Sequence, residues 1–263
     1  MPEAAGLRVV VDGSVARLTL DRPERRNAQT PALWRRLAAV PDELPADVRV
    51  VVLRAEGPSF SAGLDRRMLA PGGVPGEPDL AAMATLSDDE LDATIAGFQS
   101  AFSWLRGPAF VSVAAVQGHT VGARFQLALA CDLMVVADDV QLAIREPSLG
   151  LVPDLGGTQP LVQALGHGRA LELCLTGRWL GPDEALASGL AVRVAPRADL
   201  DAVVDDLVAA VLGVAPGAAR ATKALLRAAA ERSFDAQLAA ERAAQAERLR
   251  DLLPGRTGDG RRG

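Results

Sequence analysis

Two carboxylates near the middle of the chain could carry protons. Glu146 and Asp154 flank an apolar stretch in the segment REPSLGLVPDLGGT (residues 145–158), and Asp154 precedes a glycine-rich turn into a helix. A pair of carboxylates can remove a proton from one atom and return it to another. The residues alone leave a second interpretation open, in which Glu146 is a solvated loop residue and Asp154 caps the helix.

Two segments of small residues could present backbone amides to a ligand. They are FSAGLD (residues 60–65), which follows a strand-like run, and QGHTVGA (residues 117–123), which lies between a predicted strand and a predicted helix. Loops at the carboxyl ends of strands are where α/β sheets usually bind ligands, and small residues let a ligand approach the backbone. Tight turns with no binding role have the same composition, so this interpretation also stays open.

Other catalytic arrangements have little support. The two histidines, His119 and His167, have no partner at metal-ligand spacing, so no metal site is expected. The chain contains no G-x-S-x-G nucleophile elbow, no phosphate-binding G-x-x-x-x-G-K-[ST] loop and no G-x-G-x-x-G dinucleotide motif. Cys131 and Cys174 lie in apolar segments and are interpreted as small buried hydrophobic residues.

Composition limits the class of protein further. The 263 residues are 49% hydrophobic and 23% charged, with a formal net charge of −5. That balance disfavours a nucleic-acid surface, which needs clustered positive charge. No apolar run is long enough to span a bilayer, and the first residues do not resemble a secretory signal, so a cytoplasmic protein without a membrane partner is expected.

Strand and helix patterns predict an α/β fold with a helical end. Strands are expected at 7–11, 14–20, 49–54, 110–116, 132–136 and 192–194, with a hairpin turn at Asp12-Gly13 between the first two. Helices are expected at 31–40 and 121–130, and a third follows the capping-box pattern of Ser87 and Glu90 and carries an apolar stripe as far as Leu105. Three Ala-rich, amphipathic helices follow at about 199–213, 217–230 and 235–250. We therefore predict a core domain over residues 1–195, a helical oligomerisation region over 196–253 and a disordered tail over 254–263.

Several of these segments together resemble the enoyl-CoA hydratase/isomerase (crotonase) superfamily. FSAGLD and QGHTVGARFQLALACD (residues 117–132) are similar to the family's two oxyanion segments, and EPSLGLVPDLGGTQ (residues 146–159) to its carboxylate segment. DRPERRNA (residues 21–28) resembles the segment that lines the CoA site, and residues 175–194 resemble the helix–turn–strand that follows the active site. The similarity runs in register from about residue 8 to residue 230.

The resemblance implies a fold, an assembly and a set of site residues. Crotonases fold as a spiral of β–β–α turns with a C-terminal helical region, form trimers or dimers of trimers, and act on acyl-CoA thioesters without a metal or redox cofactor. Two backbone amides hold the thioester oxygen. The matching residues are Leu64 and Ala123 for those amides, Glu146 and Asp154 for catalysis, Arg26 and Ala28 for CoA, and Ala62, Asp65, Gly122 and Gln126 for the substrate.

One departure from the family pattern bears on the reaction. Family hydratases use two glutamates, and Gln126 stands where one of them would be, although a glutamine cannot exchange a proton near neutral pH. Family isomerases often carry an acid at the position of Asp154. We therefore expect double-bond isomerisation of an enoyl-CoA. The alternatives are a hydratase that uses Glu146 with Asp154, and a non-catalytic acyl-CoA-binding or scaffold subunit.

Overall fold

The computed structural model describes residues 5–61, 63–70 and 72–252. The chain divides into two compact units, one that ends at Val208 and one that starts at Ala209. The division falls inside the helix α7 (Leu200–Leu212) and not at residue 195, where the sequence pattern changes. The first turns of α7 belong to the first unit because Leu200 and Val204 are buried, and because Asp201 and Asp205 pair with Arg54 and Arg17 of the sheet.

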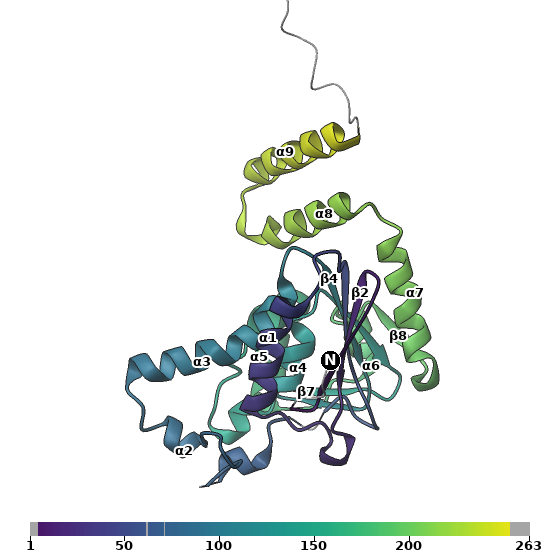
Figure 1. The fold of residues 1–263 in the computed structure, drawn as a ribbon. Coiled ribbons are helices and arrows are strands. Elements are labelled where there is room, and N and C mark those ends of the chain that lie inside the picture. The colour runs from purple at the N-terminus through teal and green to yellow at the C-terminus, as the bar shows by residue number, and fades with distance from the viewer. Residues whose placement is uncertain (1–4, 62, 71, 253–263) are drawn as a thin grey trace, which may run out of the picture. The chain divides into compact units, whose positions relative to one another are not determined.

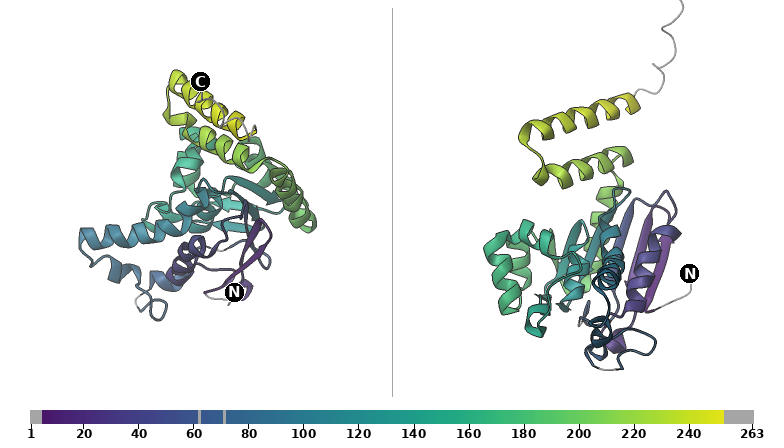
Figure 2. Two further views of the ribbon diagram at one scale, coloured as in Figure 1. Left: turned by 45° about the horizontal axis from the view of Figure 1, so that its top comes forward. Right: turned by 90° about the vertical axis from the view of Figure 1, so that its left-hand side faces the viewer.

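A six-stranded sheet forms the centre of the first unit, in the order β1-β2-β3-β4-β6-β8. The strands are β1 (Leu7–Asp12), β2 (Val15–Leu20), β3 (Val50–Ala55), β4 (Val111–Val116), β6 (Leu133–Ala137) and β8 (Arg193–Ala195). Only β1 and β2 pair antiparallel, through the expected turn, and this purple hairpin lies at one edge of the sheet in Figure 2. The expected α/β class is confirmed.

The chain winds as a spiral in which each turn contributes to two sheets. β4 is followed by β5 (His119–Val121) and α4 (Ala123–Leu129), and β6 is followed by β7 (Gln141–Ala143) and α5 (Thr158–Thr176). β5 and β7 pair in parallel as a small second sheet, and a parallel bridge from Ser61 to Thr120 adds the segment after β3 to it. The small sheet therefore brings the segments near residues 61, 120 and 142 side by side.

Two sequence-based boundaries need correction. Residues 119–121 were expected to belong to a loop and the start of a helix, but they form β5, and α4 begins at Ala123. The pairing of β5 with β7 and with Ser61 accounts for the difference, because strand pairing over three residues leaves almost no periodic signal. α1 (Pro31–Glu43) also continues past Val40, through Pro41.

The main hydrophobic core lies on one face of the large sheet. Alternate residues of the strands, such as Leu18, Leu53 and Val136, point into it together with side chains of α1 and of α3 (Asp88–Ser103). Ser87 and Glu90 form the predicted capping box at the start of α3. Figure 1 shows α1, α4 and α5 gathered on one side of the sheet. α2 (Leu80–Met83) and α6 (Pro182–Ala187) complete the helices of this unit in the described residues.

The second unit contains α8 (Pro216–Ala228) and α9 (Phe234–Leu252). α8 carries its apolar residues on one face, as expected. The expectation that the last helix is amphipathic is wrong, because α9 spreads its apolar and charged residues around its whole circumference and buries none of them. The predicted disordered tail, residues 254–263, lies outside the described residues.

No single helix in the described ranges is long and apolar enough to cross a membrane. Two successive helical stretches, Arg197–Leu212 and Pro216–Glu231, reach that length and apolar character only when they are taken together across the bend between them.

Gly118 lies in the turn between β4 and β5 and packs against the segment after β3, and its replacement tests this arrangement. Its φ is +55°, and an added Cβ would overlap the carbonyl oxygen of Pro58. Gly118→Ala should therefore lower the free energy of unfolding by more than about 1 kcal/mol, measured as a lower thermal midpoint. Gly168→Ala, at a helical position with open space around it, is the control and should leave the midpoint unchanged or higher. Equal midpoints for Gly118→Ala and the unmodified protein would contradict this account of the turn.

Candidate active site

Glu146 lies at the centre of the candidate site. It follows β7, at the start of the short 3₁₀ helix Glu146–Leu149, and its side chain is largely buried. Its Oε1 accepts a hydrogen bond from Gln126 Nε2 at 2.7 Å, and its Oε2 accepts one from the Arg145 amide at 3.0 Å. Burial raises the pKa of the Glu146 carboxyl, while these two hydrogen bonds oppose the rise. A carboxylate with a raised pKa is a stronger base for abstracting a proton from carbon.

Gly122 allows Glu146 to lie against the start of α4. A Cβ added at Gly122 would lie 3.2 Å from Glu146 Oε1 and 3.3 Å from Oε2. The backbone of Gly122 also has φ +59°, a conformation that residues with a Cβ rarely adopt. Its amide donates to the Ala143 carbonyl at 2.9 Å, which ties the start of α4 to β7. Gly122 thus lies at the site as expected, and its role here is to leave room for the carboxylate.

The amides of Leu64 and Ala123 come from two segments that lie side by side. Ser61 pairs with the β5 strand, and a Cβ added at Gly63 would lie 3.2 Å from the Val121 carbonyl oxygen. Ala123 is the first residue of α4, so its amide has no helical acceptor. Within the described residues, neither the Leu64 amide nor the Ala123 amide donates a hydrogen bond to a protein group. The two neighbouring segments therefore each carry a free donor, and that of Ala123 directly follows Gly122, which lies against the Glu146 carboxylate.

Asp154 reaches the same region from the segment before α5. Its side chain is half-buried, and desolvation raises the pKa of its carboxyl. Its charge also acts on Glu146, where it contributes to the raised pKa of that group. Gln99 of α3 anchors the backbone here, because its Nε2 donates to the Asp154 carbonyl at 2.6 Å. The structure therefore brings together the two carboxylates that the sequence identified.

Gln126 and Asp65 have protein partners that the sequence did not reveal. Gln126 exposes 0% of its surface, and its Oε1 accepts from the amides of Leu155 and Gly157 at 2.9 and 3.2 Å. The Asp65 carboxylate binds the Arg67 side chain and amide, and these contacts lower the pKa of Asp65. Both residues were expected to contact substrate, but in this structure their polar atoms bind protein groups. Ala62, the fourth residue of that set, lies outside the described residues.

The expected CoA residues lie next to the first amide segment. Arg26 is exposed on a turn with φ +48°, and Ala28 is half-buried. The residues on either side of Ala28 bind the 61–65 segment: Ser61 Oγ donates to the Asn27 carbonyl at 2.9 Å, and the Gln29 amide donates to the Gly63 carbonyl at 3.0 Å.

The role of Asn27 was not expected from the sequence, although its residue type offered a signal. It is 2% exposed with φ +52°, and its side chain bonds the Arg22 amide and the carbonyls of Glu56 and Ser59. Asparagine tolerates a left-handed backbone better than most residues and can bond to nearby peptide groups.

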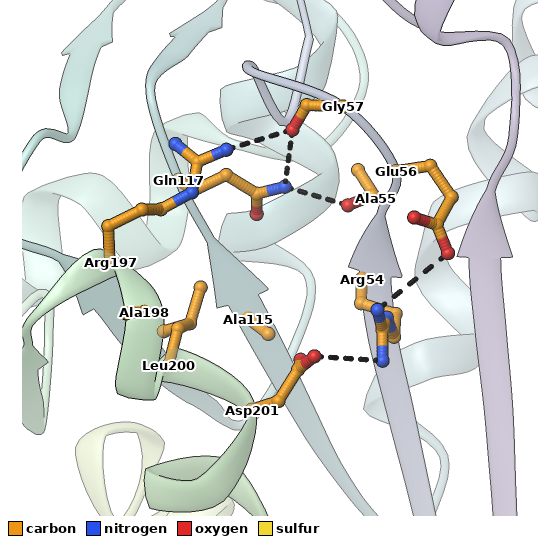
Figure 3. Close-up of a pocket in the computed structure, with 10 residues that line it drawn as sticks. All are labelled: Arg54, Ala55, Glu56, Gly57, Ala115, Gln117, Arg197, Ala198, Leu200 and Asp201. Carbon is orange, nitrogen blue, oxygen red and sulfur yellow. Dashed lines mark hydrogen bonds and ion pairs between the residues drawn. The ribbon is translucent and has the colours of Figure 1, made fainter.

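A hollow of about 180 Å³ lies near the ends of β3 and β4 and is lined by none of the expected site residues (Figure 3). Its charged groups bind one another or the backbone. Arg54 pairs with Glu56 and Asp201, and Arg197 donates to the Gly57 carbonyl and pairs with Asp139. The pairing leaves little uncompensated charge to attract a ligand, so we do not include this hollow in the candidate site.

Asp154 and Asp65 should respond to pH with opposite signs. Asp154→Asn removes a carboxylate that burial disfavours, so it should raise the thermal midpoint at pH 8. As pH rises, the Asp154 carboxyl ionises at a lower pH in the unfolded chain than in the folded protein. The rise in midpoint caused by Asp154→Asn should therefore grow from about pH 3.9 up through the raised pKa of folded Asp154. Asp65→Asn should lower the midpoint at pH 8, with a loss that shrinks as pH falls through the lowered pKa of Asp65. Midpoint shifts of the same sign at pH 8 would contradict this.

Comparison with known proteins adds independent findings to this geometry. Residues 11–251 match the profile of the family described as enoyl-CoA hydratase/isomerase. A Thermobifida fusca protein, provisionally named an enoyl-CoA hydratase and solved in complex with acetoacetyl-CoA, is 51% identical, with 94% of this chain and 96% of that chain covered and a TM-score of 0.90. The same relative has also been solved with CoA, at a TM-score of 0.88.

Two curated relatives carry different reaction names. A probable enoyl-CoA hydratase of Mycobacterium bovis is 30% identical over 88% of this chain and 84% of its own length. The human mitochondrial Δ(3,5)-Δ(2,4)-dienoyl-CoA isomerase is 32% identical over 80% of this chain and 64% of its own length. The resemblance seen in the sequence and the expected fold are both confirmed. The chain belongs to the enoyl-CoA hydratase/isomerase, or crotonase, superfamily.

Proposed function

We propose that this protein binds an acyl-CoA thioester and moves protons on an enoyl-CoA, with double-bond isomerisation as its favoured reaction. The observation that carries the proposal is the position of the Glu146 carboxylate against Gly122, next to the unpaired amide of Ala123. A base and a fixed hydrogen-bond donor beside each other are the groups that enolate chemistry requires.

The two free amides would stabilise the negative charge that develops on the thioester oxygen. When a proton leaves the carbon next to the carbonyl, electron density moves to the carbonyl oxygen and forms an enolate. In the described residues the Leu64 and Ala123 amides have no protein acceptor, so they would not have to break a hydrogen bond to bind that oxygen. The loss of one such donor in other enzymes costs about 100- to 1,000-fold in rate.

Glu146 and Asp154 would carry the proton. Isomerisation removes one proton from carbon and returns one proton at another carbon, so it needs no water and leaves the proton count unchanged. Burial raises the pKa of both carboxyls, which makes each carboxylate a stronger base toward a proton on carbon. Gln126 cannot join this exchange because an amide does not titrate in this range. The chemistry moves protons only, so the proposal includes no metal or redox cofactor.

The CoA part of the substrate is assigned to the side of the site where Arg26 and Ala28 lie. Arg26 is exposed and can reach a phosphate, and Ala28 lies beside the segment that carries Leu64. The CoA and acetoacetyl-CoA complexes of the Thermobifida fusca relative support an acyl-CoA ligand.

Hydration of a 2-enoyl-CoA is the second candidate. The names of several relatives, including the Mycobacterium bovis protein, favour it. Hydration would require one carboxylate to activate water and the other to protonate the α-carbon, and Glu146 with Asp154 could take these roles. A third alternative is a subunit that binds acyl-CoA without turnover. Incubation with 2-enoyl-, 3-enoyl- and dienoyl-CoA, with products identified by mass and absorbance, separates the three. A dominant 3-hydroxyacyl product would contradict isomerisation as the favoured reaction.

Substitution of each carboxylate tests the assignment. Glu146→Gln and Asp154→Asn should each lower turnover of the best substrate by at least about 100-fold, the usual scale of general acid–base catalysis. Binding of an acyl-CoA, measured by calorimetry, should remain because the two amides are unchanged. Glu172→Gln, at an exposed residue paired with Arg178, is the control and should keep full turnover. Near-normal turnover by both site variants would show that the carboxylate assignment is wrong.

We also propose that the chain assembles as a homotrimer or a dimer of trimers. Large apolar side chains of the second unit support this, since Leu226, Phe234 and Leu252 are each at least 70% exposed. Sedimentation at micromolar concentration should give three or six times the mass of one chain, and Phe234→Asp should weaken the assembly. Gln245→Asp, at an exposed polar position of the same helix, should not. A monomer across the micromolar range would contradict this proposal.

A further inference from the structure

Gln126 is a fully buried side chain with partners at both ends of its amide. It lies on α4, one turn after Ala123, and none of its surface is exposed. Its Nε2 donates to Glu146 Oε1 at 2.7 Å, while its Oε1 accepts from the amides of Leu155 and Gly157 at 2.9 and 3.2 Å. One end must therefore donate to a carboxylate, and the other must accept from two backbone N–H groups.

These partners fix the orientation of the amide and restrict the residue type. The oxygen and nitrogen of a glutamine often cannot be told apart, but here two N–H donors on one side and a carboxylate on the other leave one arrangement. Glutamine combines a donor and an acceptor at this side-chain length. A methionine would leave both backbone donors unpaired, and an ionised glutamate would place a second negative charge in contact with Glu146.

The acceptor end of Gln126 holds the turn that carries Asp154. Leu155 is the next residue after Asp154, and Gly157 lies three residues after it. A Cβ added at Gly157 would lie 2.7 Å from Gln126 Cγ. Gln99 holds the Asp154 carbonyl from the other side at 2.6 Å. Gln126 therefore holds this turn by hydrogen bonds, and the backbone position of the turn determines where the Asp154 side chain is attached.

We propose that Gln126 is a positioning residue that holds Glu146 and the Asp154 turn in one geometry through the two ends of a single amide. The proposal deepens the function proposed above and rests on it for the activity. It replaces the expectation that Gln126 contacts substrate. Because a misplacement of about 1 Å can cost about 100-fold in rate, a residue that never touches the substrate can still govern turnover.

Gln126→Met and Gln126→Glu test the two ends of the amide separately. Gln126→Met should lower kcat by about 10- to 100-fold, with a change in KM of less than about threefold, because the thioester-binding amides are unchanged. Gln126→Glu should remain active at pH values at which the two carboxyls, at positions 126 and 146, share one proton. The protonated carboxyl at position 126 can then donate to Glu146 and accept from both backbone amides. Its kcat should then fall at higher pH through an alkaline limb that the unmodified protein lacks.

Gln163→Met provides the matched control for Gln126→Met. Gln163 is exposed on α5, so its replacement should leave kcat, KM and the pH profile unchanged. Two results together would overturn the proposal: a kcat of Gln126→Met within about threefold of the unmodified protein, and a pH profile of Gln126→Glu equal to that of the unmodified protein. The loss of one hydrogen bond to a charged group normally costs more than about a threefold change in rate.

A second readout keeps the test independent of the enzymatic proposal. Hydrogen exchange of the Leu155 and Gly157 amides should be slow in the unmodified protein and faster by about tenfold or more in Gln126→Met, as expected for the loss of a buried hydrogen bond. If no CoA thioester is turned over but these amides respond, the proposed function fails and the positioning role stands. Unchanged exchange in Gln126→Met would overturn the positioning role, whatever the activity.

Discussion

The hydrogen bond between Gln126 and Glu146 is the contact on which the candidate site depends. A carboxylate taken out of water is costly unless it is paired or hydrogen-bonded, and here a neutral amide at 2.7 Å supplies part of that compensation. The compensation is incomplete, so the pKa of Glu146 stays raised and the group remains a usable base. Gly122 gives the carboxylate room for this contact, since an added Cβ would lie only 3.2 Å from Glu146 Oε1.

The spiral topology explains how distant segments of the chain reach this contact. Each turn passes from the large sheet to the small one and then into a helix or loop, so that equivalent points of successive turns lie side by side. Ser61, Thr120 and Leu142 are joined in this way by parallel pairing. The residues that follow them include Leu64, Ala123 and Glu146, which are the two free amides and the carboxylate. This repeated connection therefore positions the two amides and Glu146, whereas Asp154 lies on a turn that Gln126 and Gln99 hold.

Much of this arrangement could be predicted from the sequence, because long elements carry a periodic signal. The β1–β2 hairpin, the capping box of α3 and the approximate positions of β3, β4 and β6 were expected and are found. The sequence does not predict β5, whose residues were expected in a loop and at the start of a helix, because three residues are too few for a periodic signal. α9 lacks the amphipathic face inferred for it. At the site, residue types pointed to Glu146 and Asp154. The partners of Gln126 could not be inferred, since they are backbone amides 29 and 31 residues away.

The central claim is that Glu146, Asp154 and two fixed amides move a proton at carbon next to a thioester. Solvent-deuterium exchange measures that step directly and does not depend on which product accumulates. The protein would be incubated in D₂O with 2-enoyl-, 3-enoyl- and dienoyl-CoA, and the recovered thioesters would be analysed by mass spectrometry. The account predicts deuterium in the acyl chain of at least one substrate with the unmodified protein, and strongly reduced incorporation with Glu146→Gln. Binding of all three thioesters without any incorporation would contradict it.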